Sequence, residues 1–85
     1  MNEYFGIGKV IRKENFKFVL NKNHKSRIAM TIKLIDANEV QIVAYDEKAD
    51  YMLRNIFEGD VILIQGKLKS ENNILIIEVK YVEKI

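Results

Sequence analysis

Residues 40–68 read VQIVAYDEKADYMLRNIFEGDVILIQGKL, and the spacing of their apolar residues changes twice. Glu39 to Tyr45 is rich in β-branched residues and predicts a strand. Ala49, Met52, Leu53, Ile56 and Phe57 then recur at i, i+3, i+4, i+7 and i+8. That spacing predicts one apolar face of a helix. Asp60 to Leu68 is apolar on both faces, which predicts a central strand after the helix.

The flanks of this helix carry typical end signals. Asp46 is a suitable N-cap, and Glu47 and Asp50 lie where the helix dipole favours acids. Gly59 follows the last apolar position, where a glycine commonly ends a helix. Capping explains these three acids well, so we expect no metal site or acid–base pair there.

On both sides of this segment, the spacing of the apolar residues indicates strands. Tyr4 to Ile11 and Phe16 to Leu20 predict one long bent strand, with Gly6 and Gly8 suited to the bend. Arg27 to Ile35 alternates apolar and polar residues, which predicts a half-buried strand. Ile74 to Val82 is the last predicted strand.

The connections are short and polar. Asn21–Lys25 and Asp36–Asn38 are predicted turns, and Ser70–Asn73 is a predicted hairpin turn because Asn tolerates a positive φ. The chain has no proline and only four glycines, so its turns depend on polar residues.

The predicted order is β-β-β-α-β-β, in a chain of 85 residues. This is the layout of the oligonucleotide/oligosaccharide-binding (OB) fold, an all-β, five-stranded Greek-key barrel with one helix. We expect residues 1–85 to form a single domain of this fold. A small open α+β sheet with the same order is the main competitor.

Composition excludes several kinds of function. The chain has no cysteine, which removes disulfides, thiolate nucleophiles and cysteine zinc sites. Its one histidine, His24, lies in a predicted turn without a second ligand, and we interpret it as a loop residue. Neither a catalytic set nor a phosphate-cradling glycine loop is present, so we expect neither an enzyme nor a cofactor. No apolar run or leader pattern indicates a membrane span or signal peptide, so a cytoplasmic location is expected.

Charge is unevenly distributed along the chain. Residues 1–35 hold eight Lys and Arg against two acids, whereas residues 36–60 hold two against seven. The near-neutral net charge of +2 therefore conceals a basic first segment and an acidic middle.

Residues 40–68 resemble bacterial single-stranded DNA-binding proteins, from their third strand through the helix into the fourth. The matching pieces are Val40–Tyr45, Ala49–Phe57, Glu58-Gly59-Asp60 and Gln65-Gly66-Lys67-Leu68. Gly6–Val10, Ala29–Leu34 and Ile76–Val82 resemble, more loosely, the first, second and last strands of that family.

The chain also departs from this family. The two long hairpins are cut to Asp36–Asn38 and Ser70–Asn73, and no tryptophan is present. The chain ends at Ile85 without the acidic, Phe-terminated tail. The resemblance therefore implies a minimal relative, similar to a mobile-element version or a primosomal-type accessory protein.

The resemblance implies sequence-independent binding of single-stranded DNA in replication, recombination or repair. Such binders stack bases on aromatic rings and hold phosphates with cations. Tyr45 lies where the family places a stacking aromatic, although a tyrosine closing the barrel rim is the alternative. Phe16 and Phe18 share one face of their strand, and are either a second stacking platform or core.

The candidate phosphate-binding residues are cations of the basic segment and of the fourth strand. They are Lys9, Arg12, Lys13, Lys17, Lys25, Arg27, Lys33, Lys67 and Lys69. Lys80 and Lys84 are weaker candidates, and nothing in the pattern assigns Tyr51. Tyr4, Phe5, Phe57 and Tyr81 are interpreted as core or interface residues.

Two other functions remain open. The barrel could be a protein-interaction or accessory module with weak or no nucleic-acid binding, which its modest charge favours. It could also be an RNA-binding OB domain. We expect a homo-oligomer, a dimer or tetramer, because small domains are marginally stable and weak sites gain from multivalency. Replication proteins are further expected partners.

Overall fold

The computed structural model describes residues 3–14, 16–18, 24–35 and 38–85, with residues 17 and 18 described by their backbone alone. Its elements are β1 (Glu3–Lys13), β2 (Lys17–Phe18), β3 (Ser26–Leu34), β4 (Glu39–Tyr45), α1 (Asp46–Asn55), β5 (Val61–Glu71) and β6 (Ile74–Lys84).

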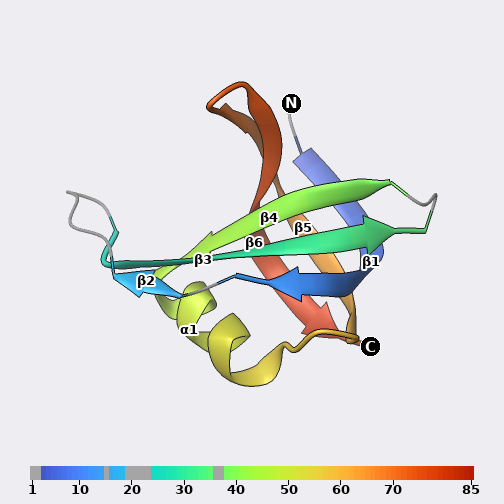
Figure 1. Cartoon of the computed structure of the whole chain (residues 1–85), viewed down its shortest axis with the longest axis horizontal. Helices are drawn as coiled ribbons and strands as arrows, with labels where there is room; N and C mark the ends of the chain where they lie inside the picture. Colours follow the sequence, from blue (N-terminus) through green and yellow to red (C-terminus); the bar gives the residue numbers. More distant parts are fainter. Residues whose placement is uncertain (1–2, 15, 19–23, 36–37) are drawn as a thin grey trace.

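The strands form one sheet that closes on itself (Figure 1). The order is β1-β5-β6-β4-β3-β2, and β1 also pairs with β3, which completes the barrel. The β4–β6 pairing is parallel, and the other pairings are antiparallel. The predicted OB barrel is confirmed, and the open sheet is not formed.

The first predicted strand is split into β1 and β2, which both run antiparallel to β3. Gly8 and Lys9 pair with β5 on one side and with β3 on the other. Beyond them the pairing with β3 shifts register between Val10 and Arg12. Strand β1 therefore pairs with both halves of the barrel at Gly8, one of the two glycines predicted to allow the bend. The register shift lies two to four residues beyond this glycine.

The barrel is filled mainly by isoleucine. Val10, Ile28, Met30, Ile32, Ile42, Ala44, Ile62, Ile64, Ile77 and Val79 meet inside it. Ala49, Met52 and Ile56 from α1 join this core, and α1 contacts β3, β4 and β6. Three positions of the predicted helix face are thus fully buried. Phe57 lies beyond the helix and is half exposed, so it does not continue that face.

The predicted caps of the helix are wrong in detail. Tyr45, and not Asp46, occupies the N-cap position, and it makes no side-chain capping bond. The Asp46 carboxylate instead accepts from the Lys25 amide. The helix ends at Asn55, four residues before Gly59. Gly59 has a φ of 94° inside a turn closed by a 3.0 Å hydrogen bond from the Asp60 amide to the Phe57 carbonyl. A positive φ at that turn position suits glycine.

The hairpin between β5 and β6 turns on two residues. Asn72 and Asn73 have φ values of 54° and 66°, which confirms the predicted use of asparagine. The strands pair as far as Glu71 and Ile74, so the turn is shorter than predicted. The end of this hairpin, residues 69–75, extends past the rest of the barrel and is called the arm below (Figure 1). Within the described residues no helix is long and apolar enough to cross a membrane.

Candidate nucleic-acid interface

The outer surface of β3, β4 and β6 carries Tyr45 and the cations Arg27 and Lys80, and Lys67 and Lys69 lie on the neighbouring strand β5. Side chains alternate across a strand, so the neighbours of the core residues point outward. On β3 and β4 the register places Arg27 opposite Tyr45 and Ala29 opposite Val43. The parallel register places Glu78 of β6 beside Val43. We call this surface the outer face: Arg27, Ala29, Thr31, Gln41, Val43, Tyr45, Ile76, Glu78 and Lys80.

The centre of the outer face is apolar and made of small or medium side chains. Ala29, Val43 and Ile76 form a second buried cluster, and Tyr45 packs against it. Thr31 is also buried. The predicted half-buried strand is therefore covered on both faces in its middle, because groups from β4 and β6 close over it.

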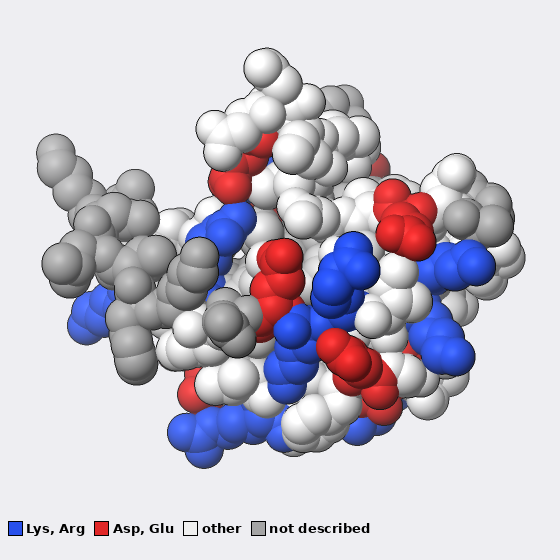
Figure 2. All heavy atoms as spheres, viewed as in Figure 1, with Lys and Arg blue, Asp and Glu red and all other residues white. Residues whose placement is uncertain are grey.

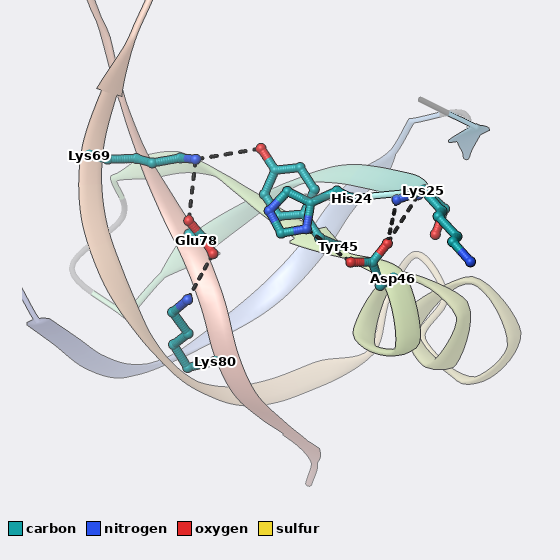
Figure 3. A network of polar contacts seen from close by, with 8 residues as sticks. His24, Lys25, Tyr45, Asp46, Lys69, Glu78 and Lys80 are labelled. Carbon is teal, nitrogen blue, oxygen red and sulfur yellow. Dashed lines mark hydrogen bonds and ion pairs between the residues drawn. The ribbon is translucent and has the colours of Figure 1, made fainter. Parts of the chain in front are cut away.

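Tyr45 stands at the end of β4, half-buried, with its ring on the outer face (Figure 3). Its ring is stacked on the His24 imidazole, with centroids 4.1 Å apart and planes 16° apart. Lys69 Nζ donates to the Tyr45 hydroxyl at 3.4 Å and lies 5.2 Å from the ring centroid. The aromatic ring predicted from sequence thus has a cation beside it.

His24 is held in place by the start of α1. Its Nδ1 lies 2.9 Å from Asp46 Oδ2, and Asp46 Oδ1 accepts from the Lys25 amide at 2.6 Å and the Ser26 amide at 3.2 Å (Figure 3). The hydrogen bond from His24, supported by these amides, lowers the pKa of the Asp46 carboxyl. One carboxylate therefore ties the residues before β3 to the first turn of α1.

Three cations around Tyr45, namely Arg27, Lys69 and Lys80, are each paired with an acid. Arg27 Nη2 lies 2.8 Å from Glu71 Oε1 of the arm. Lys69 Nζ and Lys80 Nζ lie 3.2 Å and 2.8 Å from the two oxygens of Glu78.

These pairs also shift the pKa values. The hydrogen bond from Lys80, and then that from Lys69, lowers the pKa of Glu78. Burial lowers the pKa of Lys69, but bonds to Glu78 and Tyr45 outweigh it and raise that pKa overall. Both members of the pair therefore stay charged at neutral pH.

A hollow of about 360 Å³ lies beside Tyr45, between the end of β4, the start of α1 and β6. Its lining includes His24, Tyr45, Asp46, Lys48, Glu78 and Lys80. Figure 2 shows that blue and red side chains alternate on the visible surface. On this face the charge segregation along the sequence is therefore not kept.

The other predicted cations are spread over the barrel. Lys67 is exposed on β5 opposite Glu78, and Lys25 is exposed just before β3. Lys9 and Lys33 pair at the opposite end of β3 from Tyr45, and both are exposed. Arg12 is exposed on β1.

Lys13 has a structural contact instead. Its Nζ donates to the Leu53 carbonyl at 2.7 Å, near the end of α1, and lies 4.3 Å from the centre of the Phe57 ring. Burial lowers the pKa of Lys13. This amine satisfies a helix carbonyl, so we leave it out of the interface.

Of the two phenylalanines of the predicted platform, only Phe16 has a described side chain. Phe16 is half-buried and packs against the barrel core. The backbones of Lys17 and Phe18 pair with Arg27 and Ser26, and their side chains lie outside the described part of the chain. The structure therefore brings together Tyr45, Arg27, Lys67 and Lys69, but not Phe16.

Sequence reasoning missed two contributors, namely His24 and Glu78, and ranked Lys80 only as a weaker candidate. His24 meets Tyr45 only through the tertiary structure, and no sequence pattern announces that contact. Glu78 had a usable signal. A two-residue turn at Asn72–Asn73 sets the hairpin register and places Lys67 opposite Glu78.

Strand order, the parallel β4–β6 pair and the helix between β4 and β5 define the protein as an OB-fold barrel. More narrowly, the chain has the fold of bacterial single-stranded DNA-binding domains. It resembles the domain of that type from Synechococcus sp., with a TM-score of 0.87 over 98% of this chain and 94% of that one, at 14% identity. The fold implied by the sequence resemblance is therefore confirmed.

Two further solved structures are similar. One is the small single-stranded DNA-binding protein of Streptomyces coelicolor, with a TM-score of 0.84 and 15% identity over 98% of this chain and 91% of that one. The other is PriB from Ralstonia solanacearum, with a TM-score of 0.78 and 13% identity over 100% and 99%. Searches of protein-family models and of curated proteins found no match.

Proposed function

We propose that this protein binds single-stranded DNA without sequence preference and without catalysis. The observation that carries the proposal is Tyr45, an aromatic ring on the outer face with the Lys69 amine 5.2 Å from its centroid. A stacking ring beside a cation is the minimal unit of single-strand recognition, because every base has a π-face and every nucleotide a phosphate.

Tyr45 supplies stacking, and four cations supply phosphate contacts. Arg27 lies on β3 opposite Tyr45, and Lys69 contacts the Tyr45 hydroxyl. Lys80 lines the hollow beside Tyr45. Lys67 is exposed two residues before Lys69 on β5. We propose a role where single strands are exposed, in replication, recombination or repair in the cytoplasm, together with replication proteins.

The affinity of one chain is expected to be modest. Stacking contributes about 1–3 kcal/mol per base in known cases, and Tyr45 is the aromatic ring that packs on the apolar floor of the outer face. Several chains on one strand would compensate through their effective concentration.

We propose that the self-association surface is the outer side of β1, β5 and β6. Phe5 and Tyr81 are both paired with Gln65 of β5, one from each side. Their exposed fractions are 65% and 46%. Two large apolar rings in one row of a sheet are a suitable surface for a second copy of the chain.

The test is fluorescence anisotropy with labelled oligo-dT, a matched RNA and a duplex, each at two salt concentrations. We expect oligo-dT to bind more tightly than duplex, with an affinity that falls as salt rises. A preference for RNA would instead support an RNA-binding barrel. Absence of binding to all three at low salt would overturn the proposal and favour a protein-interaction module.

A further inference from the structure

This inference rests on the proposed function. Four of the five groups proposed to contact a strand, namely Tyr45, Arg27, Lys69 and Lys80, are already engaged by side chains of the protein itself. We propose that the free protein fills its own binding face, with His24 in the place of a base on Tyr45 and Glu78 in the place of a phosphate. A strand binds by exchange with these two internal ligands.

The His24–Tyr45 contact has the geometry of two stacked rings. The planes are 16° apart and the centroids 4.1 Å apart, so the imidazole covers one face of the tyrosine ring. An imidazole is a flat nitrogen heteroaromatic ring, like the five-membered ring of a purine. A base that stacks on this face of Tyr45 must displace His24.

Built contacts hold His24 in this position. Its Nδ1 lies 2.9 Å from Asp46, whose carboxylate also accepts from two backbone amides that lead into β3. Asp46 has a φ of 56°, a left-handed conformation that few side chains other than Asp and Asn adopt readily. The His24 and Asp46 side chains are 34% and 38% exposed, so exchange needs no opening of the core.

Glu78 bridges two amines as a phosphate would. Its two carboxylate oxygens contact different lysines, Lys69 at 3.2 Å and Lys80 at 2.8 Å (Figure 3). A phosphodiester also presents two anionic oxygens that can join two cations. Glu71 repeats the arrangement on the arm with one contact, 2.8 Å from Arg27.

Exchange has a measurable consequence for salt dependence. When a lysine leaves an internal carboxylate to bind a phosphate, the phosphate releases a counterion but the freed carboxylate attracts one. The net number of ions released is therefore smaller than for a lysine without an internal partner. The displaced carboxylate then also repels the strand. Neutralising Glu78 should therefore tighten binding and steepen the decrease of affinity with salt.

The experiment compares oligo-dT affinity for the wild type, Glu78→Gln, Glu71→Gln, His24→Asn and His24→Phe. Asparagine can still bond to Asp46 but has no ring, whereas phenylalanine keeps a ring without the bond. Glu58→Gln is the matched control, because Glu58 is an exposed acid in the turn beyond the far end of α1. Thermal unfolding verifies that each variant folds.

We expect Glu78→Gln to bind about three- to tenfold more tightly, the effect of releasing two partly exposed ion pairs. His24→Asn should also bind more tightly than the wild type, and more tightly than His24→Phe, which keeps a ring to stack on Tyr45. Glu58→Gln should bind like the wild type. In the wild type, the His24 ring proton resonances should lose their ring-current shift when oligo-dT saturates the protein.

Weaker or unchanged binding by both Glu78→Gln and His24→Asn, with the wild type still binding, would overturn this inference alone. So would His24 resonances that do not move at saturation. If neither the wild type nor any variant binds, the proposed function fails as well. Binding by Glu78→Gln but not by the wild type would support the inference in its strongest form.

Discussion

At the residue scale, Tyr45 connects the fold to the proposed binding. The ring ends β4, packs on Ala29, Val43 and Ile76, and contacts His24 and Lys69. The ring is thus held in one orientation by neighbours on four strands and by His24, which precedes β3. A fixed ring loses little conformational entropy when a base stacks on it.

Removing this ring should weaken binding strongly. We expect Tyr45→Ala to lower the affinity for oligo-dT about 5- to 100-fold, the equivalent of one lost stacking contact. Tyr45→Phe keeps the ring and should lose much less. Tyr51→Ala is the control, because Tyr51 is exposed on α1. Equal affinities for Tyr45→Ala and Tyr51→Ala in an anisotropy titration would contradict the role of Tyr45.

Asp46 makes a pH-dependent contribution to stability. Its hydrogen bonds with His24 and the Lys25 and Ser26 amides lower its pKa below the usual 3.8. A carboxyl whose pKa is depressed by folding stabilises the native state above its unfolded pKa, and this contribution is lost as pH falls through the folded pKa.

Asp46→Asn should therefore lower the urea midpoint of unfolding at neutral pH, whereas wild type and variant should converge near about pH 2. Asp50→Asn is the control, because Asp50 is exposed and pairs only with Arg54 among its described contacts. A gap between wild type and Asp46→Asn that persists unchanged in acid would show that the carboxylate charge is not the cause.

At the scale of elements, β5 and β6 lie close together at Gly66, with no room for a side chain there. The register shifts between Gln65 and Gly66, and a Cβ at position 66 would overlap the Glu78 carbonyl and lie 2.7 Å from Ile77 Cγ2. Both neighbours belong to β6, whose backbone is held by β4 and β5. They cannot move without disturbing two pairings.

Gly66→Ala should therefore destabilise the protein by about 1–3 kcal/mol, as overpacking does in other cores. Gln65→Ala, one residue earlier and exposed, should change stability by no more than a few tenths of that amount. Denaturant unfolding of both variants measures the difference. Equal stability of the two variants would mean that the strands separate at little cost.

The arm is the element that departs most from its predicted role. The sequence predicted a hairpin cut short at Ser70–Asn73, but β5 and β6 continue to a two-residue turn. Glu71 near the tip reaches Arg27, and Ile74 and Leu75 are exposed. Because the turn has only two residues, the strands extend as far as Glu71, and the Glu71 carboxylate reaches the outer face.

At the scale of the whole molecule, assembly should follow from the exposed rings on β1 and β6. We expect the wild type to form a dimer or tetramer in multi-angle light scattering, and Phe5→Asp to shift it toward monomer. Charge in a buried apolar contact is costly because it loses its water. A monomeric wild type would contradict the proposed assembly.

Leu75→Asp is the matched control. Leu75 is 59% exposed, close to the 65% of Phe5, but it lies on the arm rather than on β1. The same loss of assembly in both variants would show that general surface hydrophobicity, and not the Phe5–Tyr81 row, drives association.

The sequence by itself determined the element order, the helix face and the barrel. These features depend on periodicity, because a half-buried strand and an amphipathic helix must repeat apolar residues at their own spacing. The position of Tyr45 at the end of β4 was also predictable, whereas its role in stacking stays a prediction. The helix caps were not predictable, because Asp46 bonds to His24 and to the Lys25 and Ser26 amides, which are distant in sequence.

Only the tertiary structure decided what surrounds Tyr45. Strand pairing brought Arg27, Lys69 and Glu78 together from positions up to 51 residues apart, and it placed Lys13 at the end of α1. Arg27 thereby acquired Glu71 as a carboxylate partner, and Lys69 and Lys80 acquired Glu78. Ion pairing depends on distance in space, and strand register, which composition does not encode, sets that distance.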